Sequence, residues 1–377
     1  MLTRISSPPV VSPCNKTSRL ISLLLTVFLL ALPVVSQAAT PWYSHGKYHT
    51  VALTQNGTVW ALGDNTFGQL GIGSYGDNAG EPIMIKGLDD VIAVLAGTNH
   101  SVALKADGTV WTWGFNGSGQ LGNGTTQHSS VPHIVAGISN VKAIATGNSH
   151  VAALKHDGTI WAWGGNNSGQ LGAGEYLKRL APVQVSELHD VAAITAGAFN
   201  TSALKKDGTV WSWGFNGKGQ LGNGSNERSI TPVQVSGLNN VHAIAAGDWH
   251  VVALKHDGSV WTWGSNRDNQ LGDITVASSS LPIKIQGLGN IADITASVGH
   301  TIAIAKNDTV WAWGDHDTGQ WGNGTSLDGS VSPVQVAGHN GLVTVAAVVN
   351  PSTILRGNHD GTHFIAEANN IITTQFW

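Results

Sequence analysis

The chain has 377 residues, with 19 Lys and Arg against 23 Asp and Glu, and a formal net charge of −4. This acidic balance argues against nucleic acid or an anionic membrane surface as a partner, because both favour basic proteins. The single cysteine, Cys14, excludes an internal disulfide, and the 48 glycines indicate a chain rich in turns.

The N-terminal segment has the pattern of an export signal. Three basic residues precede the apolar run 20–32, and the small-residue sequence SQAA leads to Ala38. The run is shorter than the roughly 20 residues that span a bilayer. We therefore predict a signal peptide over 1–38 and a mature domain over 39–377, with a net charge of −7 once the three basic residues are removed. The alternative is an uncleaved membrane anchor.

The rest of the chain repeats with a period near 50 residues. The first tryptophan of a W-x-W-G or W-x-L-G sequence marks each copy, at Trp60, Trp111, Trp161, Trp211, Trp261 and Trp311. A glutamine follows nine residues later in each copy, and residues 359–370 match the pattern as a seventh, diverged copy. A fixed period near 50 indicates an array of similar supersecondary units.

Each copy is predicted to contain four strands, with an Asn-Gly or Asp-Gly turn between the second and the third. Both faces of the V-W-x-W strand are apolar, which is typical of a sheet buried on both sides. Four-stranded sheets stacked face to face around an axis form a β-propeller. We therefore predict an all-β, seven-bladed β-propeller built from about 50-residue repeats. Trp211 is expected to be almost fully buried in the wedge between two blades, and Trp42 and Ile371 are expected in or beside the same blade.

The sequence A-L-K-x-D-G-x-V-W-x-W-G-x-N-x-x-G-Q-L-G-x-G resembles the repeat of the regulator of chromosome condensation family, whose members are seven-bladed propellers. The resemblance covers residue 46 to about residue 370. It implies two kinds of function. The family's nuclear namesake promotes guanine-nucleotide exchange on a small GTPase, and secreted members inhibit β-lactamases by binding to them. The fold alone does not decide between them, because function depends on the sites that a fold carries.

Residues that recur in every copy are predicted to serve folding. A histidine opens the second predicted strand of five copies, at His49, His100, His150, His250 and His300. A shared zinc ion would need their nitrogens about 2.0–2.1 Å from one point, whereas neighbouring sheets lie roughly 10 Å apart. We therefore predict a hydrogen bond from each ring to local backbone, and neither a metal nor another cofactor. The repeated glutamines are predicted to brace their loops.

Motifs of catalysis are missing from the sequence, which has no G-x-S-x-G, H-E-x-x-H or phosphate-binding loop. We predict that the chain is not an enzyme. The sequence DHDTG at 315–319 has part of a calcium loop but lacks a third ligand and the distal glutamate, so a solvated turn is predicted. The Asn-Gly-Thr and Asn-Gly-Ser triplets are explained equally by turn chemistry and, in a eukaryotic secretory route, by glycosylation.

Residues that break the repeat are the candidates for function. The two positions between Gly and His of G-x-x-H differ in every copy, and we call this pair the variable slot. Loops of this kind should emerge on one face around the axis, where a rigid scaffold carries binding residues. The predicted partner-binding residues are Tyr48, Asn99, Ser149, Phe199, Asp248 and Trp249. Phe67, Phe115 and Phe215 lie in another set of loops and are predicted to pack.

The sequence thus favours an exported, monomeric protein-binding module, periplasmic or extracellular, that engages a protein partner through one rim. The first alternative is a regulator of a small GTPase, as the resemblance implies. The signal segment, the acidic charge and the even spacing argue against it, because no copy has room for the long blade insertion through which that activity acts. The second alternative is an enzyme with a site in the central channel.

Overall fold

The computed structural model describes residues 42–273, 275–316, 330–336, 354–357 and 364–367, all of which belong to the unit Ala38–Trp377. The predicted signal segment 1–38 and Ile371 lie outside the described residues, so the cleavage site and the arrangement of the two ends stay predictions. Within the described ranges no helix has the length and apolar character needed to cross a membrane.

The described residues form six four-stranded antiparallel sheets and one strand pair. The first three sheets are β1 (Trp42–His45), β2 (His49–Leu53), β3 (Val59–Gly63) and β4 (Ala79–Met84); β5 (Val91–Ala96), β6 (His100–Lys105), β7 (Val110–Gly114) and β8 (Ser129–Ile134); and β9 (Val141–Thr146), β10 (His150–Lys155), β11 (Ile160–Gly164) and β12 (Arg179–Gln184). The next three are β13 (Val191–Ala196), β14 (Asn200–Lys205), β15 (Val210–Gly214) and β16 (Ser229–Gln234); β17 (Val241–Ala246), β18 (His250–Lys255), β19 (Val260–Ser265) and β20 (Ser278–Lys284); and β21 (Ile291–Ala296), β22 (His300–Ala305), β23 (Val310–Gly314) and β24 (Ser330–Val336). The pair is β25 (Ile354–Gly357) with β26 (Phe364–Glu367).

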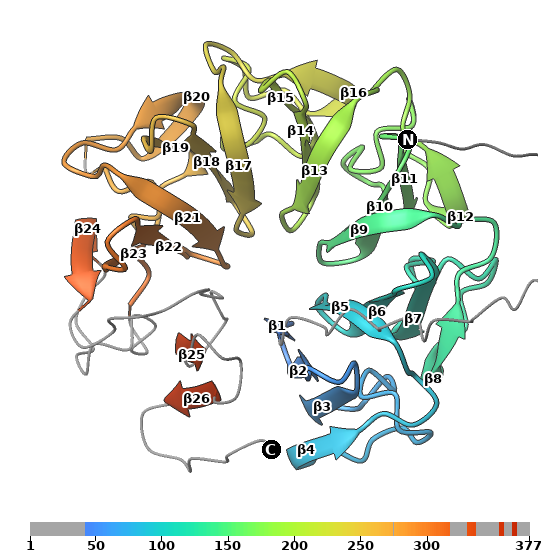
Figure 1. Ribbon diagram of the computed structural model, residues 1–377. Coiled ribbons are helices and arrows are strands. Elements are labelled where there is room, and N and C mark those ends of the chain that lie inside the picture. The colour runs from blue at the N-terminus through green and yellow to red at the C-terminus, as the bar shows by residue number, and fades with distance from the viewer. Residues whose placement is uncertain (1–41, 274, 317–329, 337–353, 358–363, 368–377) are drawn as a thin grey trace, which may run out of the picture. The chain divides into compact units, whose positions relative to one another are not determined.

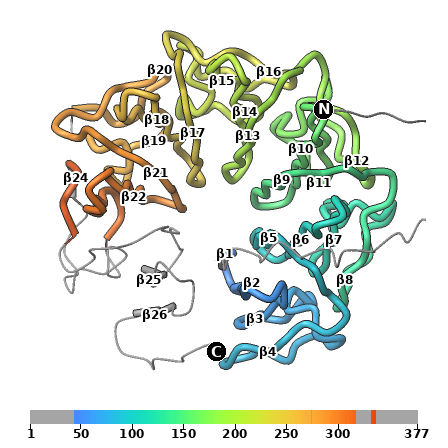
Figure 2. Tube along the Cα trace, viewed as in Figure 1, coloured from blue at the N-terminus to red at the C-terminus, as the bar shows by residue number. Residues whose placement is uncertain are grey.

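Each sheet is one blade of a β-propeller, and its strands follow chain order. The first strands of the blades lie nearest the centre and the fourth strands lie outside, as Figure 1 shows. From the second blade to the sixth, the first strand contacts strands of the preceding blade, for example β5 against β2 and β17 against β13. The trace therefore passes from blade to blade around a common centre (Figure 2). The repeat predicted this architecture, and the all-β propeller is confirmed.

The predicted number of seven blades is wrong for this structure. Six repeats fold as complete blades, whereas the seventh copy supplies only the pair β25 and β26 among the described residues. That copy has Phe364 and Ala366 where the others have their two tryptophans, and Glu367 where they have glycine. The residues that shape the third strand of the other copies are thus absent from it.

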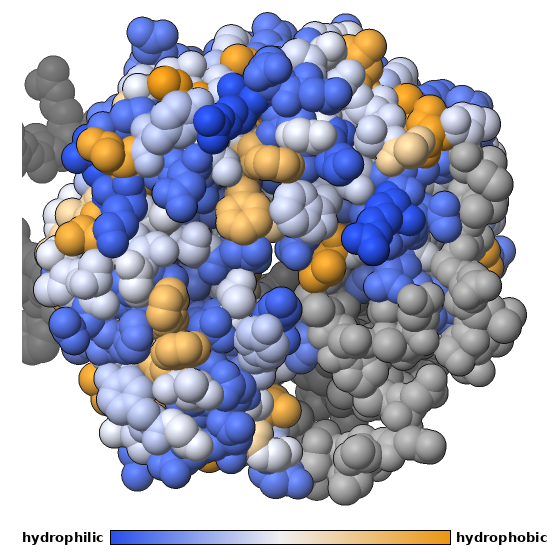
Figure 3. Space-filling view, turned by 180° about the vertical axis from the view of Figure 1, so that it is seen from behind, coloured by the Kyte–Doolittle hydropathy of each residue, from blue (hydrophilic) through white to orange (hydrophobic). Residues whose placement is uncertain are grey.

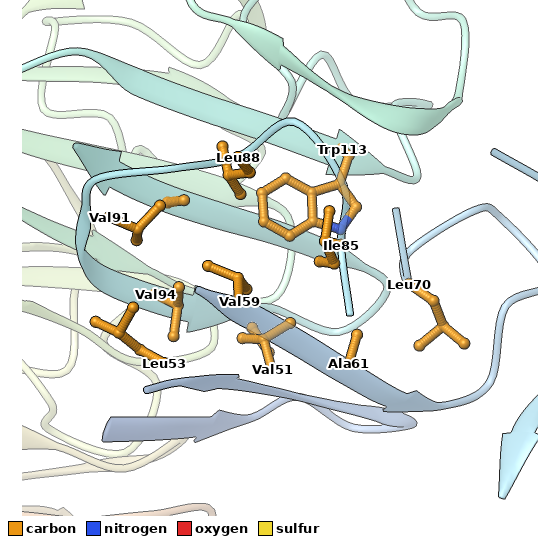
Figure 4. Close-up of a cluster of buried hydrophobic side chains, with 12 residues drawn as sticks. Val51, Leu53, Val59, Ala61, Leu70, Ile85, Leu88, Val91, Val94 and Trp113 are labelled. Atoms are coloured by element: carbon orange, nitrogen blue, oxygen red, sulfur yellow. The ribbon is translucent and has the colours of Figure 1, made fainter. Parts of the chain in front are cut away.

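The tryptophan that fills the wedge between blades is the second of each W-x-W-G sequence. Trp213 is completely buried, whereas Trp211 is only partly buried, so the prediction for Trp211 is wrong. Trp113 of β7 shows the arrangement, because it packs into a cluster that includes Val59, Leu88 and other side chains of the preceding blade (Figure 4). Its indole N–H donates to the backbone carbonyl of Gln69 at 2.8 Å. The buried ring therefore also satisfies its one polar group across the interface.

The outermost strands are edges that carry apolar side chains. Ile83, Met84, Val131 and Ile134 are exposed there. Every outermost strand also contains a proline, at Pro82, Pro132, Pro182, Pro232, Pro282 and Pro333. Proline has no backbone N–H to offer another strand, so it discourages pairing of these edges with other chains.

Candidate functional site

Four of the five histidines of the second strands bond to hydroxyl groups of the next blade, whereas the Nε2 atom of His300 has no hydrogen-bond partner among the described residues. The ring Nε2 of His49 lies 2.7 Å from Ser101 Oγ, and that of His150 lies 3.0 Å from Thr201 Oγ1. Because both hydroxyls donate to a glutamine carbonyl of the histidine's own blade at 2.9 Å, the ring N–H must be the donor. The prediction of a bond to local backbone is therefore wrong. The bond has a structural role, as predicted, but it joins two blades.

Burial keeps these histidines neutral. Burial lowers the pKa of His49, His100 and His250 from 6.5 to about 3, and that of His150 and His300 to about 4. The buried Nδ1 atoms have no hydrogen-bond partner among the described residues in four of these rings, those of His49, His100, His150 and His250. A second ring proton would have no acceptor there, which further disfavours the imidazolium form.

The repeated glutamine braces its loop, as predicted. The Oε1 atom of Gln120 accepts the backbone N–H of Ser118 at 2.9 Å, and Gln170 does the same for Ser168. The glutamine carbonyl is the group that accepts the indole N–H of the next blade. One residue therefore fixes both its own loop and the blade interface.

The variable slots and the loops after W-x-W-G lie side by side. The N–H of Phe215 donates to the carbonyl of Phe199 at 2.9 Å, and the N–H of Gly165 donates to that of Ser149 at 2.7 Å. Around the centre, the slot of one blade bonds to the slot of the next, because Ala198 N–H donates to the carbonyl of Asp248 at 3.0 Å. The two sets of loops are therefore on one face of the propeller.

Three of the six predicted partner-binding residues line one groove. Ser149, Phe199 and Trp249 are partly buried, and they border a hollow of about 530 Å³ that crosses the face from the second blade to the fifth. We call this hollow the Trp249 groove. Its lining consists of Ser118, Ser149, Gly165, Asn166, Asn167, Ser168, Gln170, Lys178, Phe199, Phe215 and Trp249.

The aromatic end of the groove includes Phe215, which the sequence predicts to pack. The ring centroids of Trp249 and Phe199 are 5.8 Å apart, and those of Trp249 and Phe215 are 5.6 Å apart in an edge-to-face arrangement. All three rings are partly buried. In sequence, Phe215 belongs to a different set of loops from the variable slots. The pairing of those loops brings it to Trp249.

The other predicted partner-binding residues lie apart from the groove lining. The Tyr48 side chain is 51% exposed, and the Lys47 ammonium lies 5.3 Å from the centre of its ring. Asn99 and Asp248 are partly buried. Burial raises the pKa of the Asp248 carboxyl, and the positive charge of Lys47 opposes that shift. Slots of the first and fifth copies are thus close enough to interact electrostatically.

A second aromatic cluster lies on neighbouring copies. Phe67 and Phe115 meet edge to face at 4.8 Å, and His128 stacks at 4.7 Å from Phe115. The two aromatic clusters are thus separate. The space-filling view of one face shows small apolar patches among mainly hydrophilic groups (Figure 3). The prediction that Phe67 and Phe115 pack is consistent with their partial burial.

The described residues contain no group of three His, Cys, Asp or Glu side chains placed to hold a metal ion. Of the sequence DHDTG, Asp315 and His316 are described and 317–319 lie outside the described residues. The solvated turn predicted there stays a prediction.

Comparison with solved structures supports the fold. Yeast RCC1 (Prp20), solved bound to Kap60, is 26% identical with a TM-score of 0.71, over 81% of this chain and 77% of that one. Prp20p of Saccharomyces cerevisiae, whose binding to Gsp1p and histones was described with its structure, is 25% identical with a TM-score of 0.68, over 78% and 76%. Human WBSCR16 is 24% identical with a TM-score of 0.74, over 82% and 86%, and shows the fold alone.

Sequence relatives match shorter parts of the chain. The mouse (Mus musculus) E3 ubiquitin-protein ligase HERC2 is 42% identical over 89 residues, which are 23% of this chain and 2% of HERC2. The Arabidopsis thaliana mitochondrial protein RUG3, an RCC1 domain-containing protein, is 37% identical over 107 residues, which are 27% of this chain and 22% of RUG3. The chain thus corresponds to a small part of these relatives. The family model described as the RCC1-like domain matches residues 30–353, and the chain belongs to the RCC1-like domain family.

Proposed function

We propose that this propeller is an exported, non-catalytic protein-binding module that engages a protein partner through the face carrying the variable slots. The observation that carries the proposal is the partly exposed cluster of Trp249, Phe199 and Phe215 beside an open groove. Tryptophan and other aromatic side chains on a rigid surface are typical of binding hot spots. The other five copies have no tryptophan at the position equivalent to Trp249, so the fold does not require one there.

The relatives support a binding role and leave the partner of this chain to be identified. Yeast RCC1 was solved bound to Kap60, and Prp20p binds Gsp1p and histones. The predicted signal peptide over 1–38 supports export, which would bring the module to a periplasmic or extracellular partner. A regulator of a small GTPase is the second candidate, which the similarity to yeast RCC1 favours.

Affinity capture with the full chain tests the proposal. The bait is used on the exported fraction and, separately, on a cytoplasmic extract containing small GTPases. We expect an exported protein to be captured, and Trp249→Ala to weaken its binding by about 2 kcal/mol or more, as truncation of a hot spot does. Phe115→Ala, which removes a ring of the other aromatic cluster, is the matched control and should retain binding.

The two extracts separate the candidates. Capture of a GTPase from the cytoplasmic extract, together with accelerated nucleotide release, would establish the second candidate. A partner whose binding is unaffected by Trp249→Ala would show that the binding surface lies elsewhere.

A further inference from the structure

The lining of the Trp249 groove includes a glycine at a position where both neighbouring copies carry phenylalanine. The position after W-x-W-G carries Phe115 in the second copy and Phe215 in the fourth, but Gly165 in the third. Phe115 and Phe215 occupy the corresponding places of their own blades, where each contacts another ring. Gly165 leaves the equivalent place without a side chain, and it is part of the groove lining.

The groove is lined by residues of four blades, and its two ends differ in chemistry. Phe199, Phe215 and Trp249 form an apolar end on the fourth and fifth blades. Ser118 and Lys178 lie toward the second and third blades. A hollow that crosses several blades suits an extended chain, which advances about 3.3 Å per residue, better than a compact small molecule.

The side chains between the two ends are able to form hydrogen bonds. Among the described residues, the hydroxyls of Ser118, Ser149 and Ser168 and the exposed side-chain amide of Asn167 have no hydrogen-bond partner. By contrast, Asn166 is fully engaged, because its side chain donates to two loop carbonyls and accepts the N–H of Leu171. The available donors and acceptors match the needs of a peptide backbone, which carries one of each per residue.

The charge of the groove lining is positive only. Lys178 is the only charged residue in the lining, which contains no carboxylate. Its ammonium donates to the carbonyl of Gly117 at 3.3 Å and has no carboxylate partner among the described residues. A partner that covered this ammonium would remove it from water, and a carboxylate would compensate for the lost hydration.

We propose that the Trp249 groove binds an extended peptide segment of the partner that places a large apolar side chain against Trp249 and Phe215 and a carboxylate beside Lys178. This inference rests on the proposed function and specifies which feature the partner must present. Gly165 creates the space for the segment, and the free serine and asparagine groups bind its backbone. The apolar side chain fixes the position of the segment, and the carboxylate fixes its direction.

A support-bound library of random octapeptides, probed with the full chain, tests the proposal. We expect the selected peptides to combine a large apolar residue with Asp, Glu or a C-terminal carboxylate at a constant separation. For the best selected peptide in solution, Gly165→Phe and Lys178→Glu should each raise the Kd at least tenfold. A peptide with Lys in place of its acidic residue should bind Lys178→Glu better than it binds the unmodified chain.

Two matched variants separate this effect from damage to the fold. Gly165→Ser introduces the residue that the fifth copy has at this position, Ser265, and should change the Kd less than Gly165→Phe does. A Cβ atom at Gly165 would meet the Ser149 hydroxyl at 2.5 Å, and that hydroxyl can rotate away. Lys206→Glu makes the same change of charge at an exposed lysine in the turn after β14, which does not line the groove, and should leave the Kd unchanged.

The proposal is overturned if the library yields no binder with a Kd below about 1 mM, or if the selected peptides have no acidic group in common. It is also overturned if Gly165→Phe and Lys178→Glu bind the peptide, and the captured partner, as well as the unmodified chain does. If Trp249→Ala still abolishes capture in that case, the face binds a partner as proposed and only the peptide groove is refuted.

Discussion

Lowering the pH from 7.5 to 5.0 is expected to destabilise the propeller through its ring of buried histidines. Their folded pKa values lie below the unfolded value of about 6.5, so the unfolded chain binds the protons. Stability is therefore complete above the unfolded pKa and is lost as the pH falls from about 6.5 toward the folded values of about 3 to 4. The hydrogen-bond geometry supports this sign, because the ring that donates through Nε2 has no acceptor for a second proton at Nδ1.

The size of the effect follows from the shift. At pH 5.0 a histidine with an unfolded pKa of about 6.5 and a folded pKa of about 4 favours unfolding by about 2 kcal/mol. The other four buried rings, His49, His100, His250 and His300, act in the same direction, so the combined loss is several kcal/mol. Such a loss is comparable to the whole free energy of unfolding of a typical domain, about 5–15 kcal/mol.

The assay is urea unfolding followed by tryptophan fluorescence at pH 7.5 and at pH 5.0. His150→Asn introduces the residue that the fourth copy has in this place, Asn200. The variant should lose about 2 kcal/mol less than the unmodified chain between the two pH values, because one buried base has been removed. The exposed His156 provides the control, and His156→Asn should lose as much as the unmodified chain. If His150→Asn also loses as much, His150 titrates alike in both states and the reasoning fails.

Three further predictions concern the interfaces between blades. Trp213→Ala should lower the free energy of unfolding by roughly 3–5 kcal/mol, because its ring is fully buried. Trp211→Ala should lower it by clearly less, because that ring is only partly buried, and equal losses in urea unfolding would contradict this. The double variant Asn200→His, Val251→Thr should recreate the bond between blades and be about 1 kcal/mol more stable than the two single changes predict, and strict additivity would refute it. Gly147→Ala should lower the melting temperature strongly, because its Cβ would overlap a histidine ring and a backbone carbonyl of the next blade, and an unchanged melting temperature would show that the blades can separate to admit it.

The architecture could be predicted from the sequence because the same residue pattern recurs in six copies. A period near 50, the paired tryptophans and the turns each recur, and each copy became a four-stranded blade. The blade count could not be predicted as well, because a diverged copy keeps its spacing while losing side chains that drive packing. Phe364 and Ala366 mark the seventh copy in sequence, yet only a strand pair is described there.

The choice between the two tryptophans illustrates a limit of periodicity. Trp211 and Trp213 share a strand face, so alternation assigns both to the same environment. Their depth differs because Trp213 reaches the carbonyl of Gln170 at 2.9 Å, whereas the indole of Trp211 bonds to Thr209 of its own turn. The difference in burial comes from contacts between blades, so the residue pattern of a single copy does not predict it.

The histidine bonds, by contrast, left a signal that comparison of neighbouring copies could have found. The ring of one copy needs a hydroxyl in the next, which Thr201 supplies to His150. The fourth copy has Asn200, and the next blade has Val251 and Ala246 at the two positions that carry the hydroxyls elsewhere. Histidine and hydroxyl are thus lost together. Pairs of adjacent copies carry information that a single consensus repeat averages away.

The candidate site could be predicted only in part, because its residues meet across the interfaces between copies. Trp249 was found because it breaks the pattern of its own slot, and Phe215 was missed because Phe115 repeats it. The contact between Phe215 and Trp249 joins the fourth copy to the fifth. Gly165 carried a further signal, since it is the one glycine at a position that has phenylalanine in both neighbouring copies. A binding surface on a propeller is formed by residues of several blades. The residues that shape it are therefore found by comparing each copy with the equivalent positions of the two adjacent copies.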